Sequence, residues 1–382
     1  MNSRERFECA RTHRTPDRTP LDIGGTPLTG MRPRCQERLL DVLGFPGASA
    51  ANGYTVDERI LEWAGADFRV VGNVLALPGK HTRTLGPTSH VDCWGVRRDL
   101  VDGEWQITDC PLREADLDQV RSYPWPEARI DDEVLDALVA RARQLKSQDK
   151  HVVVAGHPVF GILELGCWMC GYDDFLMKFA LAPDVVRAFF DAVLAIQLDV
   201  IDQYYAALGP YIDLTTSGDD FGSQNGPLVS PAMFESMIAP YFAERIRRTK
   251  AVAGCDYWHH TCGSVFQLLD HIVDCGVDML NPVQTSAAEM DPAALKTRFG
   301  DRIVFWGAVD VQQFLPGATP REIPEHIEQL MTVLGADGGY VMAPAHQIQD
   351  DVPAENLVAW IETVRKSDSR SASPPPGDTP RL

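Results

Sequence analysis

The sequence has no run of about 18 apolar residues, so we expect no transmembrane helix. Its N-terminal segment, residues 1–6, lacks the apolar stretch of a signal peptide. Basic residues are scarce: 35 Lys and Arg stand against 54 Asp and Glu, which gives a net charge of −19, and no basic cluster is visible. This balance argues against nucleic acid or an anionic membrane surface as a partner. We therefore expect a cytoplasmic protein that binds neither.

A disulfide framework is also missing. The nine cysteines are odd in number and irregularly spaced, which favours a reducing compartment in which most of them are buried as small apolar residues. The segment Cys167-Trp168-Met169-Cys170 is formally a CxxC motif. Because no second CxxC matches it, and because a Trp-Met filling is typical of a core, we favour a packing role over a redox or metal role.

Strand-like and helix-like segments alternate along most of the chain. Eight short apolar, β-rich runs are found at 20–23, 68–71, 152–155, 211–215, 257–260, 278–281, 303–306 and 340–343. Stretches of helical periodicity separate most of them, at 183–207, 232–251, 264–274, 291–299 and 321–334. Parallel strands need a crossover that a helix supplies, so the pattern predicts an α/β fold, a (β/α)8 TIM barrel. A doubly wound open sheet is the rival, but no GxGxxG follows the first strand.

Two segments depart from this alternation. Residues 80–112 read as extended pieces and turns, with Asp102-Gly103 as a hairpin signal. We predict an antiparallel β excursion after the second strand, which either covers a sheet edge or acts as a substrate lid. The segment 367–382 is rich in Ser, Pro, Asp and Arg, and we predict a disordered tail. Residues 1–366 are then a single TIM-barrel domain.

The most informative motif is His260-Thr261-Cys262-Gly263, at the end of the predicted strand 257–260. Side chains at i and i+2 of an extended segment point the same way, so His260 and Cys262 suit two corners of one metal ion. The lone His346 would supply a third ligand and leave a coordination position open, as in catalytic zinc sites. A packed Cys beside a buried, hydrogen-bonded His is the alternative interpretation.

Polar residues also follow the other predicted strands, where barrel enzymes carry their chemistry. Asp219-Asp220, on a Gly-flanked loop, could orient a zinc ligand, bind a cationic substrate or serve as an acid. A helix N-cap or turn is the alternative for this pair. His157 and Glu164 are further catalytic candidates, although each has a structural explanation. The candidates for substrate binding are Asp22, Gln224, Asn225, Gln284 and Trp306.

Several segments together carry a resemblance to a known family. They read Ser3-Arg4-Glu5-Arg6, Pro16-Asp17-Arg18-Thr19-Pro20, Asp219-Asp220-Phe221-Gly222, His260-Thr261-Cys262-Gly263, Asn281-Pro282-Val283-Gln284, Phe305-Trp306-Gly307 and Ala343-Pro344-Ala345-His346. With them the chain resembles the uroporphyrinogen decarboxylase superfamily, and within it the cobalamin-dependent methyltransferases that work with corrinoid proteins. The likeness spans nearly the whole chain up to the predicted tail.

The resemblance implies a (β/α)8 barrel and, for the methyltransferase branch, a zinc ion held by His-x-Cys and a later Cys. His260 and Cys262 stand on the first two positions, and His346 stands where the later Cys is expected. His can ligate zinc, but this departure is also compatible with altered or lost metal binding. A His at this position is similar to the decarboxylases, which use no metal.

The decarboxylase activity itself fits poorly. Its Arg-rich N-terminal loop, which grips propionate carboxylates, is absent. The corresponding stretch reads Asp22-Ile23-Gly24-Gly25-Thr26, with Arg32 and Arg34 as isolated cations. A substrate with eight carboxylates needs clustered guanidinium groups.

Our leading hypothesis is a zinc-dependent methyltransferase that moves a methyl group between a small molecule and the cobalt of a corrinoid. The zinc would either hold a thiol acceptor as thiolate or act as a Lewis acid on an O-, N- or S-methyl donor. The chain has no DxHxxG-type cobalamin anchor, so the corrinoid should arrive on a partner protein.

Two other functions stay open. One is a metal-free lyase acting on a small carboxylate, with Asp219 and His346 as its polar groups. The other is a non-catalytic binder of a methylated ligand or of a corrinoid protein. The methyl donor and acceptor are not identified, and the oligomeric state is left open, a homodimer included.

Overall fold

The computed structural model describes residues 1–26, 28–47, 49, 55–72 and 82–370. The chain divides into two compact units. The smaller unit combines Met1–Phe68 with the chain from Asp291 onward, and the larger unit is Arg69–Met290. The single-domain organisation expected for residues 1–366 stays a prediction.

Strand β1 (Phe68–Val71) spans the boundary between the two units in the sequence. Phe68 is the last residue of the N-terminal part of the smaller unit, and Arg69 is the first residue of the larger unit. The other strands of its parallel part are β6 (Val152–Ala155), β7 (Leu214–Gly218), β8 (Asp256–His260) and β9 (Met279–Asn281). They lie in the order β1-β6-β7-β8-β9, and β6 with β7, β7 with β8 and β8 with β9 pair in parallel. The predicted parallel α/β arrangement is therefore found in this unit.

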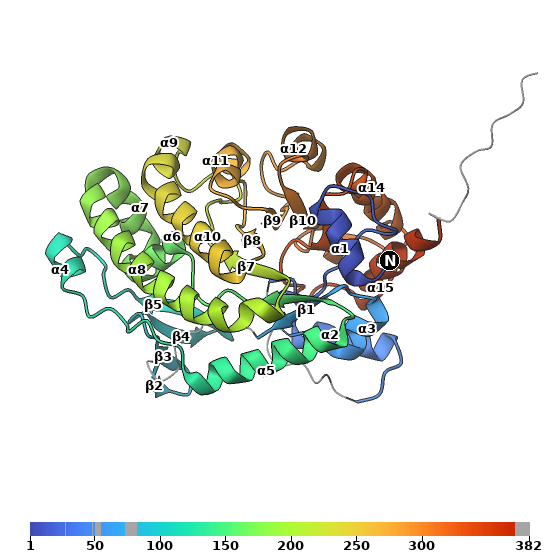
Figure 1. Cartoon of the computed structure of the whole chain (residues 1–382), viewed down its shortest axis with the longest axis horizontal. Coiled ribbons are helices and arrows are strands. Elements are labelled where there is room, and N and C mark those ends of the chain that lie inside the picture. The colour runs from blue at the N-terminus through green and yellow to red at the C-terminus, as the bar shows by residue number, and fades with distance from the viewer. Residues whose placement is uncertain (27, 48, 50–54, 73–81, 371–382) are drawn as a thin grey trace, which may run out of the picture. The chain divides into compact units, whose positions relative to one another are not determined.

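Helices connect these strands (Figure 1). They are α4 (Leu117–Arg121), α5 (Asp132–Gln148), α6 (Ile162–Cys170), α7 (Tyr172–Leu181), α8 (Pro183–Leu208), α9 (Pro231–Met233), α10 (Ala239–Ala253) and α11 (Leu269–Asp274). Short turns of other helix types occur at Gly209–Tyr211, Phe234–Ile238 and Phe266–Leu268. Pro183 opens α8 at a position where its missing N–H has no helical partner.

The core of the larger unit lies between β6 and the helices α5 and α8. All four residues of β6 are buried, as expected for a strand covered on both faces. Val153 and Ala155 share a cluster with Val200, Ile201 and Tyr204 of α8. Each fully buried side chain of this size stabilises the fold by roughly 1.5–3 kcal/mol, so this packing fixes where the ends of the strands lie.

The predicted antiparallel excursion is confirmed. It forms a separate sheet in the order β2-β3-β4-β5, made of β2 (Arg83–Gly86), β3 (Ser89–Val91), β4 (Arg97–Val101) and β5 (Glu104–Asp109). Asp102 and Gly103 join β4 to β5 with φ of 52° and 85°, because a two-residue hairpin turn of this type needs positive φ at both positions. Residue 80 and residue 81 of the predicted excursion lie outside the described residues.

The smaller unit carries β10 (Val304–Val309) and β11 (Tyr340–Pro344), which pair in parallel. Its helices are α1 (Ser3–Arg11), α2 (Pro33–Val42), α3 (Glu58–Ala64), α12 (Pro292–Phe299), α13 (Phe314–Gly317), α14 (Ile323–Gly335) and α15 (Ala354–Arg370). Helix α15 continues to Arg370, four residues into the segment expected as a tail. Residues 371–382 lie outside the described part.

The first predicted strand, 20–23, does not form a ladder. Leu21 makes a single parallel bridge with Met342 of β11, and the chain turns away at Gly24, whose φ is +92°. Among the described residues, seven of the eight predicted strands therefore form, namely β1 and β6 to β11. The closed eight-stranded barrel is not confirmed. Among the described residues, no helix is long and apolar enough to cross a membrane.

Candidate functional site

Strand β8 points its two histidines to opposite sides, because successive side chains of a strand alternate. The ring of His259 lies 4.6 Å from that of Phe242 in α10, and its Nδ1 is 2.8 Å from Oγ of Ser217. His259 therefore faces the helices and is held there by packing. His260 points to the other side, where the next residues of the chain form the candidate site.

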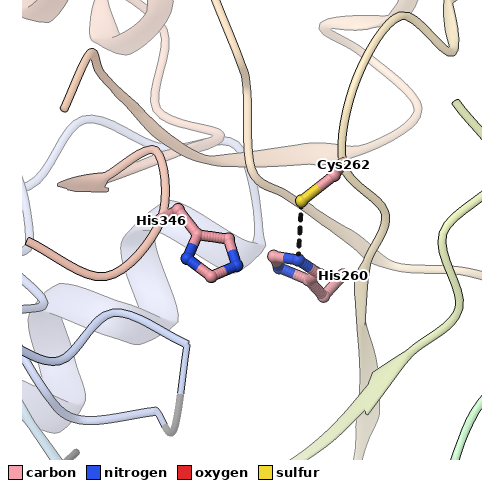
Figure 2. A group of neighbouring side chains, drawn as sticks. All are labelled: His260, Cys262 and His346. Atoms are coloured by element: carbon pink, nitrogen blue, oxygen red, sulfur yellow. Dashed lines mark hydrogen bonds between the residues drawn. The ribbon is translucent and has the colours of Figure 1, made fainter. Parts of the chain in front are cut away.

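The imidazole of His260 is held in one tautomer. Its Nδ1 lies 2.6 Å from Oδ1 of Asn281, an acceptor, so Nδ1 carries the hydrogen and donates it. Nε2 then presents its lone pair 3.1 Å from Sγ of Cys262 (Figure 2). Asn281 reaches His260 because it ends β9 directly opposite His260 in the parallel register. A carbonyl oxygen that fixes one ring nitrogen and frees the other is the usual outer partner of a metal-binding His.

The turn after His260 is held on several sides. The backbone N–H of Cys262 donates to Oδ1 of Asp220 at 2.7 Å, and the N–H of Gly263 donates to Oε1 of Gln284 at 2.8 Å. Gly263 has a φ of +80°, and a Cβ there would lie 2.5 Å from the carbonyl oxygen of Ser223. Glycine is therefore required after the cysteine, and the position of Sγ is set by the backbone around it.

Burial keeps His260 and Cys262, which we call the donor pair, in their neutral forms. Burial lowers the pKa of His260, against the opposing effect of Asp220 and of the bond to Asn281. Burial raises the pKa of the Cys262 thiol well above its usual range, and the negative charges of Asp220 and Glu164 add to that rise. A thiolate at this position requires a compensating cation, so the surroundings suit a thiol or a metal-bound sulfur.

The adjacent carboxylates Asp219 and Asp220 do different things. Asp219 is fully buried and accepts the N–H groups of Ile162, Leu163 and Glu164, the first turn of α6. Burial raises its pKa to about 6, and these hydrogen bonds and the charge of Arg245 oppose the rise. Asp219 thus serves as the N-terminal cap that Gly161 cannot provide. Asp220 is partly exposed, and its Oδ1 lies 3.8 Å from Nε2 of His260.

Glu164 joins the candidate site and His157 does not. The N–H of Asp220 donates to Glu164, and burial with the nearby charges of Asp220 and Asp219 raises the pKa of Glu164 well above its usual range. The ring of His157 lies 6.3 Å from that of Tyr257, on the side of β8 opposite to His260. Burial lowers the pKa of His157 to about 3, so it is a neutral, packed imidazole. Its catalytic role stays a prediction.

The predicted substrate-binding residues fall into two groups. In the larger unit, Gln284 donates from Nε2 to Oε1 of Gln224 at 3.0 Å, and Asn225 is exposed in the same loop. In the smaller unit, Nε1 of Trp306 donates to Oδ2 of Asp22 at 2.9 Å, and both side chains are fully buried. Substrate contact by any of the five stays a prediction.

His346 belongs to the smaller unit and follows β11, as the sequence predicted. The N–H of Ala345, the preceding residue, donates to the carbonyl of Val309 in β10 at 2.8 Å, which anchors the segment. The imidazole is half-buried.

The sequence interpretation treated Trp168 as a core residue and did not identify it as a candidate site residue. Its neighbours Cys167, Met169 and Cys170 are buried as predicted, but the indole of Trp168 is only half-buried. It lies one helical turn after Glu164 on the same side of α6. Its ring contacts Phe160 at 4.7 Å between centroids, and the guanidinium of Arg98 in β4 lies 5.2 Å from it. In the sequence, its spacing of four residues from Glu164 was the signal that could have placed both side chains on the same side of a helix.

The uroporphyrinogen decarboxylase (URO-D) family profile matches residues 95–367. The chain belongs to this family. Curated uroporphyrinogen decarboxylases from Psychromonas ingrahamii and Serratia proteamaculans are 32% identical over 100 residues and 31% identical over 98 residues. These alignments cover 26% of this chain and 27% and 26% of the two relatives, so they span about a quarter of either relative.

A solved structure shares the fold over nearly the whole chain. It is described as a methyltransferase from Methanosarcina mazei, and it superposes with a TM-score of 0.64 at 16% identity. The match covers 96% of this chain and 99% of that chain. At 16% identity the likeness concerns the fold of this chain alone. The activity of the chain has to be inferred from the site.

Proposed function

We propose that this protein is a zinc-dependent methyltransferase that moves a methyl group between a small molecule and the cobalt of a corrinoid protein. The observation that carries the proposal is the pairing of His260 Nε2 with Cys262 Sγ at 3.1 Å, with the other ring nitrogen fixed by Asn281. Membership in the URO-D family and the fold shared with a methyltransferase support it.

We infer that His346 supplies the third ligand, at the rim of a closed (β/α)8 barrel. His346 follows β11, at the position where the family resemblance implies the third ligand. Two neutral imidazoles and one thiolate suit zinc by chemistry and leave a fourth position for a substrate atom. Asn281 fits this assignment because it orients the ring as outer partners of zinc ligands do.

A bound zinc would either hold a thiol acceptor as thiolate or polarise the heteroatom of an O-, N- or S-methyl donor. The residues of the chain would position the metal ligands and hold or deliver the proton. Asn281 orients His260, while Asp220 and Gln284 hold the backbone that carries Cys262. Glu164 and Asp220 place carboxyl groups beside the pair, where a proton can be held or delivered. The corrinoid is expected on a partner protein, since the sequence shows no cobalamin anchor of the DxHxxG type.

Metal analysis tests the proposal directly. Protein purified without chelator should contain about one zinc per chain, and His260→Ala or Cys262→Ala should lose it. Cys93→Ala is the matched control, because Cys93 is a free cysteine in the antiparallel excursion. Wild-type protein should also methylate cob(I)alamin from a methyl donor, which its visible spectrum reports. Full activity of Cys262→Ser without any metal would refute the proposal.

A metal-free lyase is the second candidate, favoured by the curated relatives, which are decarboxylases. In that case Asp219 and His346 would act on a small carboxylate. The capping bonds of Asp219 to α6 weigh against a direct role for it. Carboxylate-dependent CO2 release by metal-free protein, retained in Cys262→Ser, would favour this candidate.

A further inference from the structure

Two glutamine side chains join the loops that follow β7, β8 and β9 in the larger unit. Gln284, in the loop after β9, accepts the N–H of Gly263 on its Oε1 at 2.8 Å and donates from Nε2 to Oε1 of Gln224 at 3.0 Å. Gln224, in the loop after β7, donates from its own Nε2 to the carbonyl oxygen of Ser286. We call Gln224 and Gln284 the amide chain.

The two ends of the amide chain determine how both amide groups are turned. The N–H of Gly263 can only donate and the carbonyl of Ser286 can only accept, so each glutamine directs its oxygen toward the first and its NH2 toward the second. Hydrogen bonds that run in one direction strengthen one another. Loss of either amide therefore breaks a continuous connection between the three loops.

Backbone contacts press the loop after β7 against the turn that carries Cys262. The N–H of Ser264 donates to the carbonyl oxygen of Ser223 at 2.8 Å. A Cβ on Gly222 would lie 2.6 Å from the carbonyl oxygen of Cys262. Because the two segments are this close, a movement of the residues beside Gln224 has to move the turn as well.

The amide chain runs from the buried turn to the surface. Gly263 is buried, Gln284 is 8% exposed and Gln224 is exposed. The residue that follows the donor-pair sulfur is thus connected through two side chains to a residue at the surface. The separation that depends on this turn is the 3.1 Å between Sγ of Cys262 and Nε2 of His260.

We propose that Gln224 is a positioning residue of the candidate metal site, which acts through Gln284 to hold Sγ of Cys262 beside His260. This inference rests on the proposed function. A metal site requires its ligand atoms to be held within about 0.5 Å of the productive geometry, and the amide chain restrains the backbone of the residue next to the sulfur. Gln224 and Gln284 then act on the metal site without touching substrate.

Zinc affinity tests the inference, because it depends on the ligand geometry and not on substrate contacts. Gln284→Met and Gln224→Met keep the length of the side chain and remove its amide. Zinc affinity should fall about 10–100-fold in Gln284→Met and about threefold to tenfold in Gln224→Met, whose hydrogen bonds are exposed to water. The double variant should bind zinc no more weakly than Gln284→Met, because Gln224 acts through Gln284. Competition with a chromophoric chelator measures each affinity.

Gln267→Met is the matched control. Gln267 is an exposed glutamine of the same unit, and its Nε2 donates to Oε2 of Glu289 at 3.0 Å, outside the amide chain. We expect its zinc affinity to equal that of wild type. Circular dichroism and urea unfolding show whether each variant is folded and how stable it is.

Alkylation of Cys262 gives a second measurement that needs no metal. In metal-free protein, Gln284→Met should react with iodoacetamide at Cys262 about fivefold faster than wild type, the factor that one lost hydrogen bond gives to a local opening. Peptide mass spectrometry locates the alkylated residue. Cys93, a free cysteine of the antiparallel excursion, is the internal control, and its rate should be the same in both proteins.

The outcomes separate the inference from the proposed function. Unchanged zinc affinity and unchanged alkylation of Cys262 in both single variants overturn the inference, even if the free energy of unfolding falls. A double variant weaker than Gln284→Met also overturns it, because Gln224 would then act on its own. If wild-type protein binds no zinc and Gln284→Met still exposes Cys262, the proposed function fails and the positioning role stands. If wild type and all variants bind zinc equally, only the inference fails.

Discussion

The carboxylate of Asp219 fills the space beside Gly161: a Cβ on Gly161 would lie 2.3 Å from Oδ1 of Asp219. Gly161 is the N-cap of α6 and has no side chain with which to cap it. Asp219, which follows β7, reaches across and takes the first three free N–H groups of the helix. The absence of a side chain at one residue thus makes room for the cap that the other supplies.

Gly161→Ala is therefore expected to destabilise the protein. The added methyl group displaces a carboxylate that accepts three buried hydrogen bonds, and we expect the free energy of unfolding to fall by about 2–4 kcal/mol. Urea unfolding followed by circular dichroism measures the change. Gly226→Ala is the control, because a Cβ at Gly226 meets no atom within 4 Å. Similar small losses for both variants would show that Asp219 is not the cap of α6.

Removing the outer partner of His260 should weaken metal binding. In Asn281→Ala the ring loses the acceptor that holds its hydrogen on Nδ1, and zinc affinity should fall about 10–100-fold. Asn281→Asp keeps an acceptor oxygen and should bind zinc close to wild type. Competition with a chromophoric chelator measures both affinities. Wild-type affinity in Asn281→Ala would mean that Asn281 does not orient a metal ligand.

His346 can be tested by exchange as well as by removal. His346→Ala should lose most of the zinc, because two protein ligands rarely hold it in a catalytic site. His346→Cys should keep about one zinc per chain, since a thiolate is as good a ligand as an imidazole. Cobalt(II) substitution adds a spectroscopic readout, because an extra sulfur ligand strengthens the thiolate-to-cobalt absorption. If His346→Ala retains full zinc content, His346 is not the third ligand.

The predicted strands were found where buried β-branched runs are bounded by turns, as in Val152–Ala155. Strand β7 begins at Leu214 and not at 211, because Gly209–Tyr211 continues helix α8 as a short 3-10 turn. The segment 20–23 failed as a strand for a local reason. The N–H of Asp22 bonds to Met342 and the N–H of Asp67 to Leu21, but Gly24 then turns the chain away after one bridge.

The motif identified the donor pair, but tertiary contacts decided the roles of its neighbours. Adjacency made Asp219 and Asp220 look equivalent, whereas one caps α6 and the other bonds to the backbone of Cys262. The direction of each side chain depends on the end of β7, which local sequence does not specify. His157 was a candidate by position, yet it lies on the helix-facing side of β8, beside Tyr257. Only the packing of the strand against its helices distinguishes these cases.

Asp22 gives the protein a pH dependence of stability that can be measured. The side chain is fully buried in the smaller unit, and burial raises its pKa to about 7, against the hydrogen bonds from Trp306 and Gly25. An unfolded Asp titrates near 3.9. Between these values the folded state holds a proton that the unfolded state has lost. The stabilisation is complete below about pH 4 and is lost as the pH rises through about 7.

Asp22→Asn should remove this dependence. Relative to wild type, its free energy of unfolding should rise between pH 4 and pH 8, by at most about 4 kcal/mol for a shift of about three pKa units. Urea unfolding at half-unit pH intervals gives the difference curve. Asp102→Asn, in the exposed hairpin turn, should give a flat difference. A flat curve for Asp22→Asn as well would mean that Asp22 is ionised in the folded protein, with Trp306 and the backbone N–H of Gly25 stabilising its charge.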